Sequence, residues 1–272
     1  MTRRRYRNEC SDYRRNGRAG ASNGSGMRKT RLQPVSDRCR YRARLRQVQT
    51  GLERQFRGAV TVKACDLTDP ESIEKFLEVI DAHNIRFDLL LNIAGIDFEG
   101  SFLSRNREHR CKIITLNDAG TLRITHAILE RRNPDKHFTA VFVSSLASMF
   151  PMPLKATYAA SKRFLLDFSR SLRQELKDQN ANVLALCPAG MVTTRENAEA
   201  IAAQGFWGYA TINPLEVVAR KTLDRALKGK ELYVPGVLNR TISALGKILP
   251  PSWVAGIIHW KWNHAQKKWM TA

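Results

Sequence analysis

Short apolar runs alternate with longer amphipathic stretches from about residue 45 onward. Residues 87–91 and 182–187 are almost continuously apolar, as expected of strands that are buried on both faces of a parallel sheet. Helical patterns of apolar residues cover about residues 108–131 and 214–227. Because parallel strands need a crossover connection, which a helix commonly supplies, this alternation predicts an α/β sandwich with ligands at the carboxyl ends of its strands.

Two more strands and a capped helix complete this pattern. Residues 59–64 form a β-branched run that predicts a strand, and residues 231–234 predict the last strand. Thr68 or Asp69 can cap a helix that begins at Pro70. The length of 272 residues is enough for one large domain with a full core.

The stretch from Val141 to Leu176 joins an apolar strand to an amphipathic helix and carries reactive side chains at the junction. Tyr158 and Lys162 are four residues apart, so they project from one helix face as neighbours, while Ser145 follows the strand. A fixed ammonium beside a phenol should lower the pKa of the phenol from about 10, which suits general acid chemistry. The alternative is a Tyr–Lys pair that occurs by chance and has no catalytic role.

The serine thirteen residues before the tyrosine, together with Tyr-Ala-Ala-Ser-Lys, resembles the active-site segment of the short-chain dehydrogenase/reductase family. The resemblance implies a Rossmann-like, doubly wound parallel sheet in a three-layer α/β/α sandwich. It also implies an NAD(P)-dependent oxidoreductase that transfers hydride between a nicotinamide cofactor and a carbonyl or alcohol. Tyr158 would donate the proton, Lys162 would lower the Tyr158 pKa and hold the nicotinamide ribose, Ser145 would bind the substrate oxygen, and Asn117 would support the relay.

Three further segments resemble cofactor-binding motifs of this family. Asn92-Ile93-Ala94-Gly95 is similar to its Asn-Asn-Ala-Gly signature, with Ile93 in place of the second Asn. Asp66 matches the position that hydrogen-bonds the adenine, although it could equally be a turn or cap residue. Residues 188–193 resemble the Pro-Gly turn that precedes a cofactor-binding threonine. The resemblance thus assigns cofactor binding to Asp66, Asn92, Ala94, Gly95, Tyr158, Lys162, Pro188, Gly190 and Thr193.

The formal charge of +20 is concentrated in the N-terminal segment. Residues 1–57 hold 17 Lys and Arg against 4 Asp and Glu, and their pattern indicates no folded unit before about Leu45. No apolar core of a secretory signal follows the arginines, so we expect a cytoplasmic protein. An alternative function is a catalytically impaired reductase-like protein whose basic arm binds nucleic acid or an anionic surface, but a nucleic acid partner is not favoured.

One motif in this basic segment resembles the family's glycine-rich turn, which contacts the cofactor pyrophosphate. It contains Gly20, Gly24 and Gly26, but no apolar strand precedes it and no amphipathic helix follows it, so a flexible Gly/Ser linker is the alternative. NADP is preferred over NAD on the basis of Arg42 and Arg44, which could meet a 2′-phosphate, although NAD stays possible.

The basic residues of this segment are almost all arginine. Of the 17 basic residues in positions 1–57, 16 are Arg, whereas the rest of the chain has 14 Arg and 14 Lys. Two accounts fit: a genuine basic extension, or a reading frame disturbed before about residue 44, which we favour. We therefore predict that the chain binds NADPH weakly or not at all and is poorly soluble.

The cysteines, the histidines and residues 194–212 bear on which metals and substrates the chain can bind. The five cysteines form no Cys-x-x-Cys pair and the six histidines lack metal-ligand spacing, so we predict neither disulfides nor a metal. Residues 194–212 fall where the family has its substrate lid, and the substrate should be apolar. The predicted division is a basic segment 1–44, a reductase domain 45–235 and a helical tail 236–272.

The tail combines tryptophan and lysine in apolar patches that are too short to span a bilayer. It is either an interfacial helix that makes a peripheral membrane contact or a pair of helices that pack on the domain or on a partner subunit. The family resemblance implies a homodimer or homotetramer.

Overall fold

The computed structural model describes residues 45–47, 49–54, 59–104, 106–192, 202 and 209–270, without the side chains of Lys247 and of residues 261–270. The chain divides into two compact units, residues 1–64 and 65–272. In the first unit, residues 45–47 and 49–54 are helical, and Gln49 Nε2 donates a hydrogen bond to the Val60 carbonyl oxygen over 2.7 Å. The predicted boundary at residue 44 stays a prediction.

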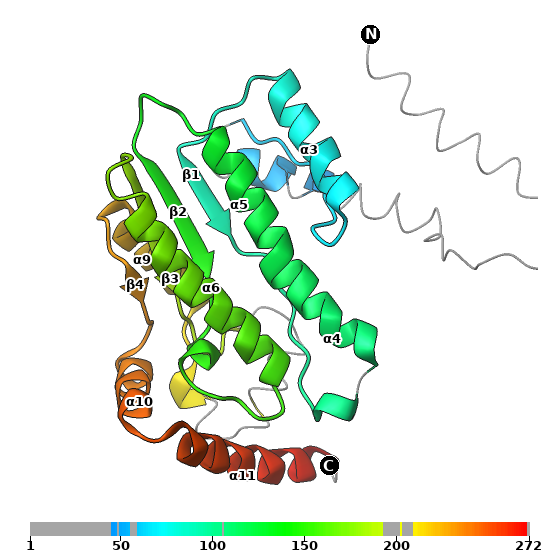
Figure 1. The fold of residues 1–272 in the computed structure, drawn as a ribbon, viewed down its shortest axis with the longest axis vertical. Helices are drawn as coiled ribbons and strands as arrows, with labels where there is room; N and C mark the ends of the chain where they lie inside the picture. Colours follow the sequence, from blue (N-terminus) through cyan, green and yellow to red (C-terminus); the bar gives the residue numbers. More distant parts are fainter. Residues whose placement is uncertain are drawn as a thin grey trace, which may run out of the picture. The chain divides into compact units, whose positions relative to one another are not determined.

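The second unit is built on a four-stranded parallel sheet (Figure 1). The strands are β1 (Leu89–Asn92), β2 (Phe138–Val143), β3 (Ala181–Leu186) and β4 (Leu232–Tyr233), in the order β1-β2-β3-β4. In the register, Leu91 pairs with Val141, and Val141 pairs with Leu184. The parallel sheet confirms the predicted α/β class, and the predicted strands at 87–91, 182–187 and 231–234 are confirmed within one or two residues.

The predicted strand at residues 59–64 was wrong, because this run forms no strand. A β-branched run becomes a strand only where a neighbouring strand pairs with its N–H and C=O groups. The β-branched pattern of Ala59 to Ala64 indicates that the segment can pair in a sheet, but it does not show that a neighbouring strand is present. Among the described residues, the first strand is therefore β1.

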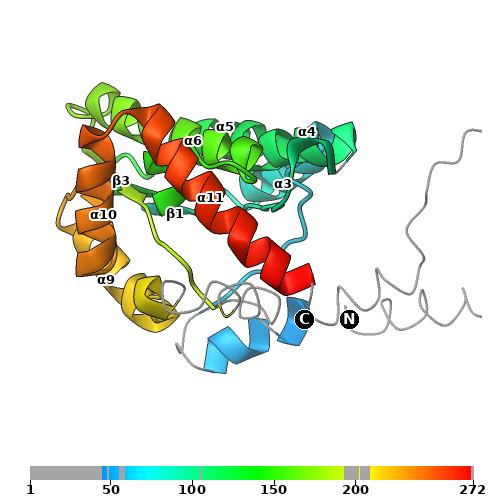
Figure 2. The same cartoon turned by 90° about the horizontal axis from the view of Figure 1, so that it is seen from below.

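Helices cover both faces of the sheet (Figures 1 and 2). The helices are α3 (Pro70–Ala82), α4 (Arg107–Ile114), a π-helix (Thr115–Gly120), α5 (Thr121–Glu130), α6 (Ala156–Glu175), α9 (Leu215–Leu227), α10 (Val237–Ile248) and α11 (Pro251–Met270), with the 3₁₀ turns η1 (Phe102–Ser104) and η3 (Leu146–Met149). As predicted, Asp69 caps α3, where its side chain accepts a hydrogen bond from Glu71 N.

Alternate residues of the central strand belong to different core clusters. Ala140 and Phe142 of β2 pack in a cluster with residues of α3, α5 and α6. Val141 packs instead with Val218 and Ala226 of α9. This alternation follows from the two-residue period of a strand and gives the predicted three layers, with α9 on one face and α3 to α6 on the other (Figure 2).

The C-terminal residues form two helices that contact the rest of the second unit. Gly246 of α10 lies against the ring of Phe150, where an added Cβ would be 2.5 Å from the ring, and Val254 of α11 is buried. Helix α11 lies at the end of the unit toward which the strands point (Figures 1 and 2). Among the described helices, none is both long and apolar enough to cross a bilayer. Packing on the domain, one of the two predicted arrangements of the tail, is therefore present.

Candidate active site

Helix α6 presents Tyr158 and Lys162 from its first two turns. The Lys162 side chain is buried, and its Nζ donates a hydrogen bond of 2.8 Å to the carbonyl oxygen of Val143, the last residue of β2. Nζ lies 5.8 Å from the centroid of the Tyr158 ring. The backbone of α6 is also tied to the strand end, because Ser144 Oγ donates to the Lys162 carbonyl oxygen over 2.7 Å. The reactive pair is thus fixed at the carboxyl end of the central strands.

Ser145 begins the 3₁₀ turn η3 just after β2. Its hydroxyl caps this turn by accepting a hydrogen bond from Ala147 N over 3.1 Å. The same hydroxyl hydrogen-bonds the Tyr158 phenol, which lowers the phenol pKa. The structure therefore places Ser145 and Tyr158 together across the loop between β2 and α6.

The predicted lowering of the Tyr158 pKa by Lys162 was wrong for the protein alone. Burial raises the Tyr158 pKa, and the Asp97 carboxylate raises it further, whereas Ser145 and the Lys155 ammonium lower it less strongly. Burial also lowers the pKa of Lys162 itself to about 8, against an opposing effect of Asp118. The four-residue spacing shows that the two side chains are neighbours, but it does not report the desolvation that dominates both groups.

Asn117 lies in the π-helix between α4 and α5 and is completely buried. Its Oδ1 accepts from Ile96 N over 2.9 Å, and its Nδ2 donates to the Ile96 carbonyl oxygen and to Ser161 Oγ, each over 3.1 Å. A carboxamide held by three hydrogen bonds has one orientation. Asn117 therefore connects the loop after β1 to α6, close to Lys162.

Gly95 is the point where these groups meet. A Cβ added there would lie 3.1 Å from Lys162 Nζ and 3.2 Å from Asn117 Oδ1. The loop after β1 can approach the two polar groups only because this residue has no side chain. Of the predicted catalytic residues, Ser145, Tyr158 and Lys162 gather at the end of β2, and Asn117 joins them through Gly95.

The other described cofactor candidates have identifiable contacts. Asn92 ends β1 and donates to Thr125 Oγ1 over 3.0 Å, and Ala94 follows it in the loop. The Pro188 carbonyl oxygen accepts from Leu146 N, and that of Gly190 accepts from Asn213 N. These contacts fix the loops after β1 and β3 beside the reactive groups.

Asp66 makes the contacts of a turn residue. Its Oδ1 accepts from Thr68 N over 2.9 Å and from Thr68 Oγ1 over 2.7 Å, and these bonds lower the pKa of the carboxyl. The predicted contact with an adenine stays a prediction. Six further candidates lie outside the described residues: Gly20, Gly24, Gly26, Arg42, Arg44 and Thr193.

Sequence reasoning missed two charged groups near the site. Asp118 is buried in the π-helix, where burial raises its pKa to about 7 while Lys162 opposes the shift. An acidic residue beside Asn117 in an apolar stretch was a signal that could have been noticed. Lys155 contacts Asp97 over 2.5 Å and lies 5.7 Å from the Tyr158 ring centroid. The partners of that pair are 58 residues apart in sequence, so no local pattern indicates it.

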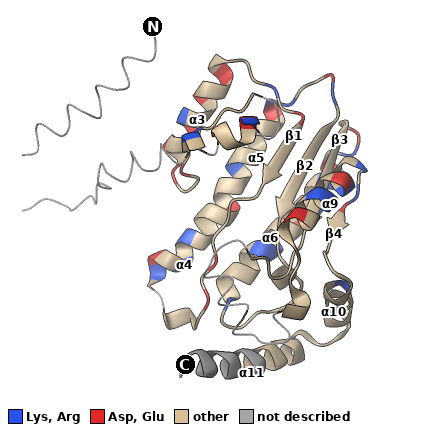
Figure 3. Ribbon diagram, turned by 180° about the vertical axis from the view of Figure 1, so that it is seen from behind, with Lys and Arg blue, Asp and Glu red and all other residues tan. Residues whose placement is uncertain are grey.

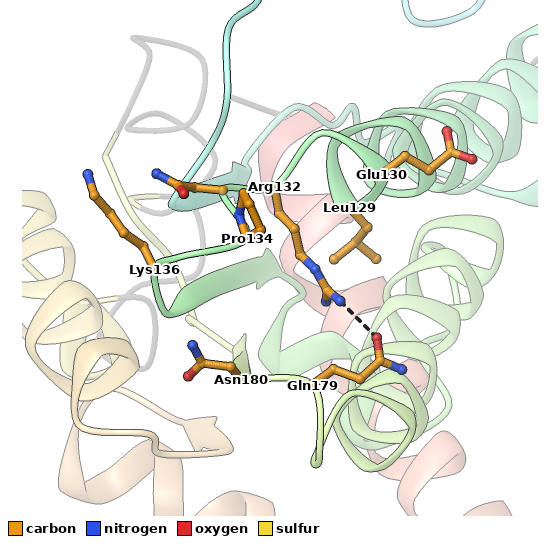
Figure 4. Close-up of a pocket in the computed structure, with 8 residues that line it drawn as sticks. Leu129, Glu130, Arg132, Pro134, Lys136, Gln179 and Asn180 are labelled. Atoms are coloured by element: carbon orange, nitrogen blue, oxygen red, sulfur yellow. Dashed lines mark hydrogen bonds between the residues drawn. The ribbon is translucent and has the colours of Figure 1, made fainter.

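A surface hollow of about 440 Å³ lies at the opposite end of the sheet (Figure 4). It is lined by residues around the starts of β2 and β3, including Lys136 and Asn180, and Arg132 donates across it to Gln179 over 3.0 Å. None of the reactive side chains lines it, so it is not the candidate active site. In the described part of the chain, no group of His, Cys, Asp and Glu could hold a metal ion.

Fold and site together define an α/β protein of the Rossmann type whose serine, tyrosine and lysine gather at a strand end. Residues 36–204 match the family described as short chain dehydrogenase, which is more than half of the chain. The chain belongs to this family.

Two curated relatives show how far the sequence similarity extends. The chain is 30% identical over 145 residues to a dehydrogenase/reductase SDR family protein 7-like of Drosophila melanogaster, covering 53% of this chain and 44% of that protein. It is 29% identical over 133 residues to the 3-oxoacyl-[acyl-carrier-protein] reductase FabG of Escherichia coli K12, covering 49% of this chain and 54% of that protein. The chain thus spans about half the length of the curated relatives it matches.

Solved structures confirm the fold. A 7beta-hydroxysteroid dehydrogenase superimposes with a TM-score of 0.68 at 15% identity, covering 80% of this chain and 83% of that one. The angucycline C-6 ketoreductase LanV with bound NADP gives a TM-score of 0.59 at 16% identity, covering 70% and 78%. A 4-hydroxyisoleucine dehydrogenase complexed with NADH gives 0.53 at 18% identity, covering 65% and 76%.

Proposed function

We propose that the protein is a reductase that transfers hydride between a nicotinamide cofactor and a carbonyl or alcohol. The observation that carries this proposal is that Tyr158 lies close to both Ser145 and Lys162 at the end of β2. A phenol and a hydroxyl that are neighbours can both hydrogen-bond one substrate oxygen. Membership of the short chain dehydrogenase family supports the same chemistry.

The residues at the nicotinamide end fit such a cofactor. Gly95 lies close to Lys162 Nζ, where an added Cβ would be 3.1 Å away, and Gly190 follows the neighbouring strand β3. We expect Lys162 to bind the ribose hydroxyls and the loops around Asn92 and Gly190 to line the ring. When bound, the cofactor supplies the hydride. The preference for NADP rests on Arg42 and Arg44, and the two solved relatives with bound NADP and with NADH support either form.

Each reactive side chain has a separate task in carbonyl reduction. Ser145 orients the substrate oxygen by a hydrogen bond, and Tyr158 delivers its hydroxyl proton to that oxygen. The raised pKa of Tyr158 keeps the phenol protonated at neutral pH, which is the state that a proton donor needs. Lys162, held by Val143, places its charge near the phenolate that forms, and Asn117 keeps the loop at Ile96 in place.

The substrate is proposed to be an apolar carbonyl compound. The predicted lid at residues 194–212 lies mostly outside the described residues, so it adds only the sequence argument. The exposed apolar side chains near the site, Phe102 and Val192, support this class. We also propose a cytoplasmic homodimer or homotetramer, as the family resemblance implies.

The test is reduction of a panel of ketones at saturating NADPH by matched tyrosine variants. Tyr158→Phe removes only the proton donor and should lower the rate at least 100-fold with little change in folding. Tyr233→Phe is the control, because the ring of this buried tyrosine packs against Arg225 and in the core cluster with α9, and it should retain the parent rate within twofold. A Tyr158→Phe rate within tenfold of the parent would contradict the assignment, and a clear preference for small charged ketones would contradict the substrate class.

The competing function is a catalytically impaired protein with a basic arm, which the charge of residues 1–57 favours. Calorimetric titration with NADPH decides between them. We expect weak binding, because the glycine-rich motif lacks an apolar strand before it. Micromolar binding would show that residues 1–44 form the cofactor site. No binding of NADPH together with tight, salt-sensitive binding to DNA or RNA would favour the basic arm.

A further inference from the structure

The outward face of α11 is apolar although the helix already packs on the second unit. Val254 is buried, whereas Trp253 and Ile257 are 66% and 60% exposed. These two residues and Trp260 are spaced four and three apart, so they lie on one face of the helix, beside the packed face. Large aromatic and aliphatic side chains that are exposed together indicate an interaction surface.

Helix α10 extends this surface. Leu245 and Ile248 are exposed there, and Leu249 follows in the connection to α11. The two helices contact each other, and both lie toward the end of the unit where the strands point (Figure 1). We call the exposed apolar residues between Leu245 and Trp260 the tail surface: Leu245, Ile248, Leu249, Trp253, Ile257 and Trp260.

The positive charge of the tail favours a negatively charged partner. Residues 237–272 contain five Lys and Arg and no Asp or Glu. In agreement, no acidic residue is coloured on α10 or on the described part of α11 (Figure 3). A second copy of the chain, docked through the same surface about a two-fold axis, would bring basic helices together. An anionic lipid surface instead complements this charge, and tryptophan favours the boundary between headgroups and acyl chains.

Helix α11 also reaches the start of α6, the helix that carries the reactive tyrosine. His259 of α11 lines a small cavity of about 160 Å³ together with Phe102 of η1 and Thr157, the residue before Tyr158. Leu103, next to Phe102, is 89% exposed. Apolar exposure is therefore present both on α11 and on the turn η1 that lines this cavity with it.

We propose that α10 and α11 dock on an anionic bilayer surface and hold the active-site entrance against it. The substrates would then be carbonyl compounds that partition into lipid. This second statement rests on the proposed reductase function, whereas the docking itself does not.

The test is sedimentation of the full chain with phosphatidylcholine vesicles that contain 30% phosphatidylserine. The Trp253→Ser/Ile257→Ser double variant should bind at least tenfold more weakly than the parent. The matched control is Leu227→Ser, because Leu227 is equally exposed, at the C-terminal end of α9 (Figure 1). It should bind within twofold of the parent. Parent binding should fall with 500 mM salt and on pure phosphatidylcholine.

Several outcomes would overturn the proposal. Unchanged vesicle binding by a folded double variant, checked by circular dichroism, would assign binding to the basic N-terminal segment. If the parent protein does not bind vesicles but elutes as a dimer in size-exclusion chromatography, and the double variant elutes as a monomer, the surface is the interface with a second copy of the chain. The Tyr158→Phe variant should bind vesicles like the parent. Because that variant is inactive under the proposed function, docking and catalysis can fail separately in these assays.

Discussion

The centre of the sheet and its β1 edge enclose the candidate site to different degrees. Strand β2 has neighbours on both sides, and Lys162 at its end is buried. Among the described residues, β1 pairs only with β2, and Leu91 and Ile93 are 40% and 63% exposed. The proposed proton-transfer groups are thus fixed by central packing, whereas the proposed cofactor residues Asn92 to Gly95 lie at and after the end of the edge strand. A catalytic lysine and a cofactor-side residue should therefore respond differently to substitution.

The largest effect is expected at the centre. Lys162→Ala should lower kcat/KM at least ~1,000-fold, or about 4 kcal/mol of transition-state stabilisation, because it removes the charge beside Tyr158. Asp66→Ala on the cofactor side should leave kcat within threefold and raise only the KM for NADPH. Steady-state kinetics of both variants measure this difference. Equal losses of kcat would break the distinction between the two regions.

The next effect concerns Gly120, the last residue of the π-helix. A Cβ there would lie 2.6 Å from the Leu67 carbonyl oxygen, which is backbone and cannot yield easily. Gly120→Ala should lower the free energy of unfolding by about 1–3 kcal/mol, measured by urea denaturation. Gly256→Ala is the control, because nothing lies within 4 Å of its added Cβ, and it should be neutral or slightly stabilising. Similar costs at both glycines would refute the packing argument.

A smaller, pH-dependent effect is expected at Asp118. Its pKa is raised from 3.8 to about 7 by burial, so its favourable contribution to folding is complete below about pH 4 and is lost as pH rises to 7. Asp118→Asn should therefore raise the free energy of unfolding at pH 8 by about 1–2 kcal/mol, since lost attraction to Lys162 offsets part of the gain. Urea denaturation at pH 4 should show no gain. A gain of equal size at both pH values would exclude the burial mechanism.

The smallest effect is expected at Leu91, which can be compared directly with its partner in the neighbouring strand. Leu91 at the edge and Val141 at the centre are register partners, but only Val141 is fully buried. Leu91→Thr should change the free energy of unfolding by less than about 0.5 kcal/mol and improve solubility. Val141→Thr should cost about 1–2 kcal/mol, because its hydroxyl enters an apolar cluster. Equal costs in parallel urea titrations would show that the edge is as enclosed as the centre.

Features that depend on one segment were predictable from the sequence. The strand before Ser145, the helix that carries Tyr158 and Lys162, and the Asp69 cap are each specified within a few residues, and each is confirmed. The strand at residues 59–64 failed because pairing needs a distant partner. The direction of the Tyr158 pKa failed because burial and the Asp97 carboxylate act from elsewhere in the chain.

The π-helix makes the segment around Asn117 sensitive to the deletion of a single residue. Each i to i+5 hydrogen bond of the π-helix encloses one residue more than the i to i+4 bond of an α-helix. The side-chain positions of α5 are therefore shifted by one residue relative to those of α4. Deleting any one residue between Thr115 and Gly120 would allow a regular α-helix. All side chains on one flank would then turn by about 100° about the axis. A single-residue gap at this place would therefore rotate either Asn117 out of reach of Ile96 or α5 off β1, although the helix itself would stay continuous.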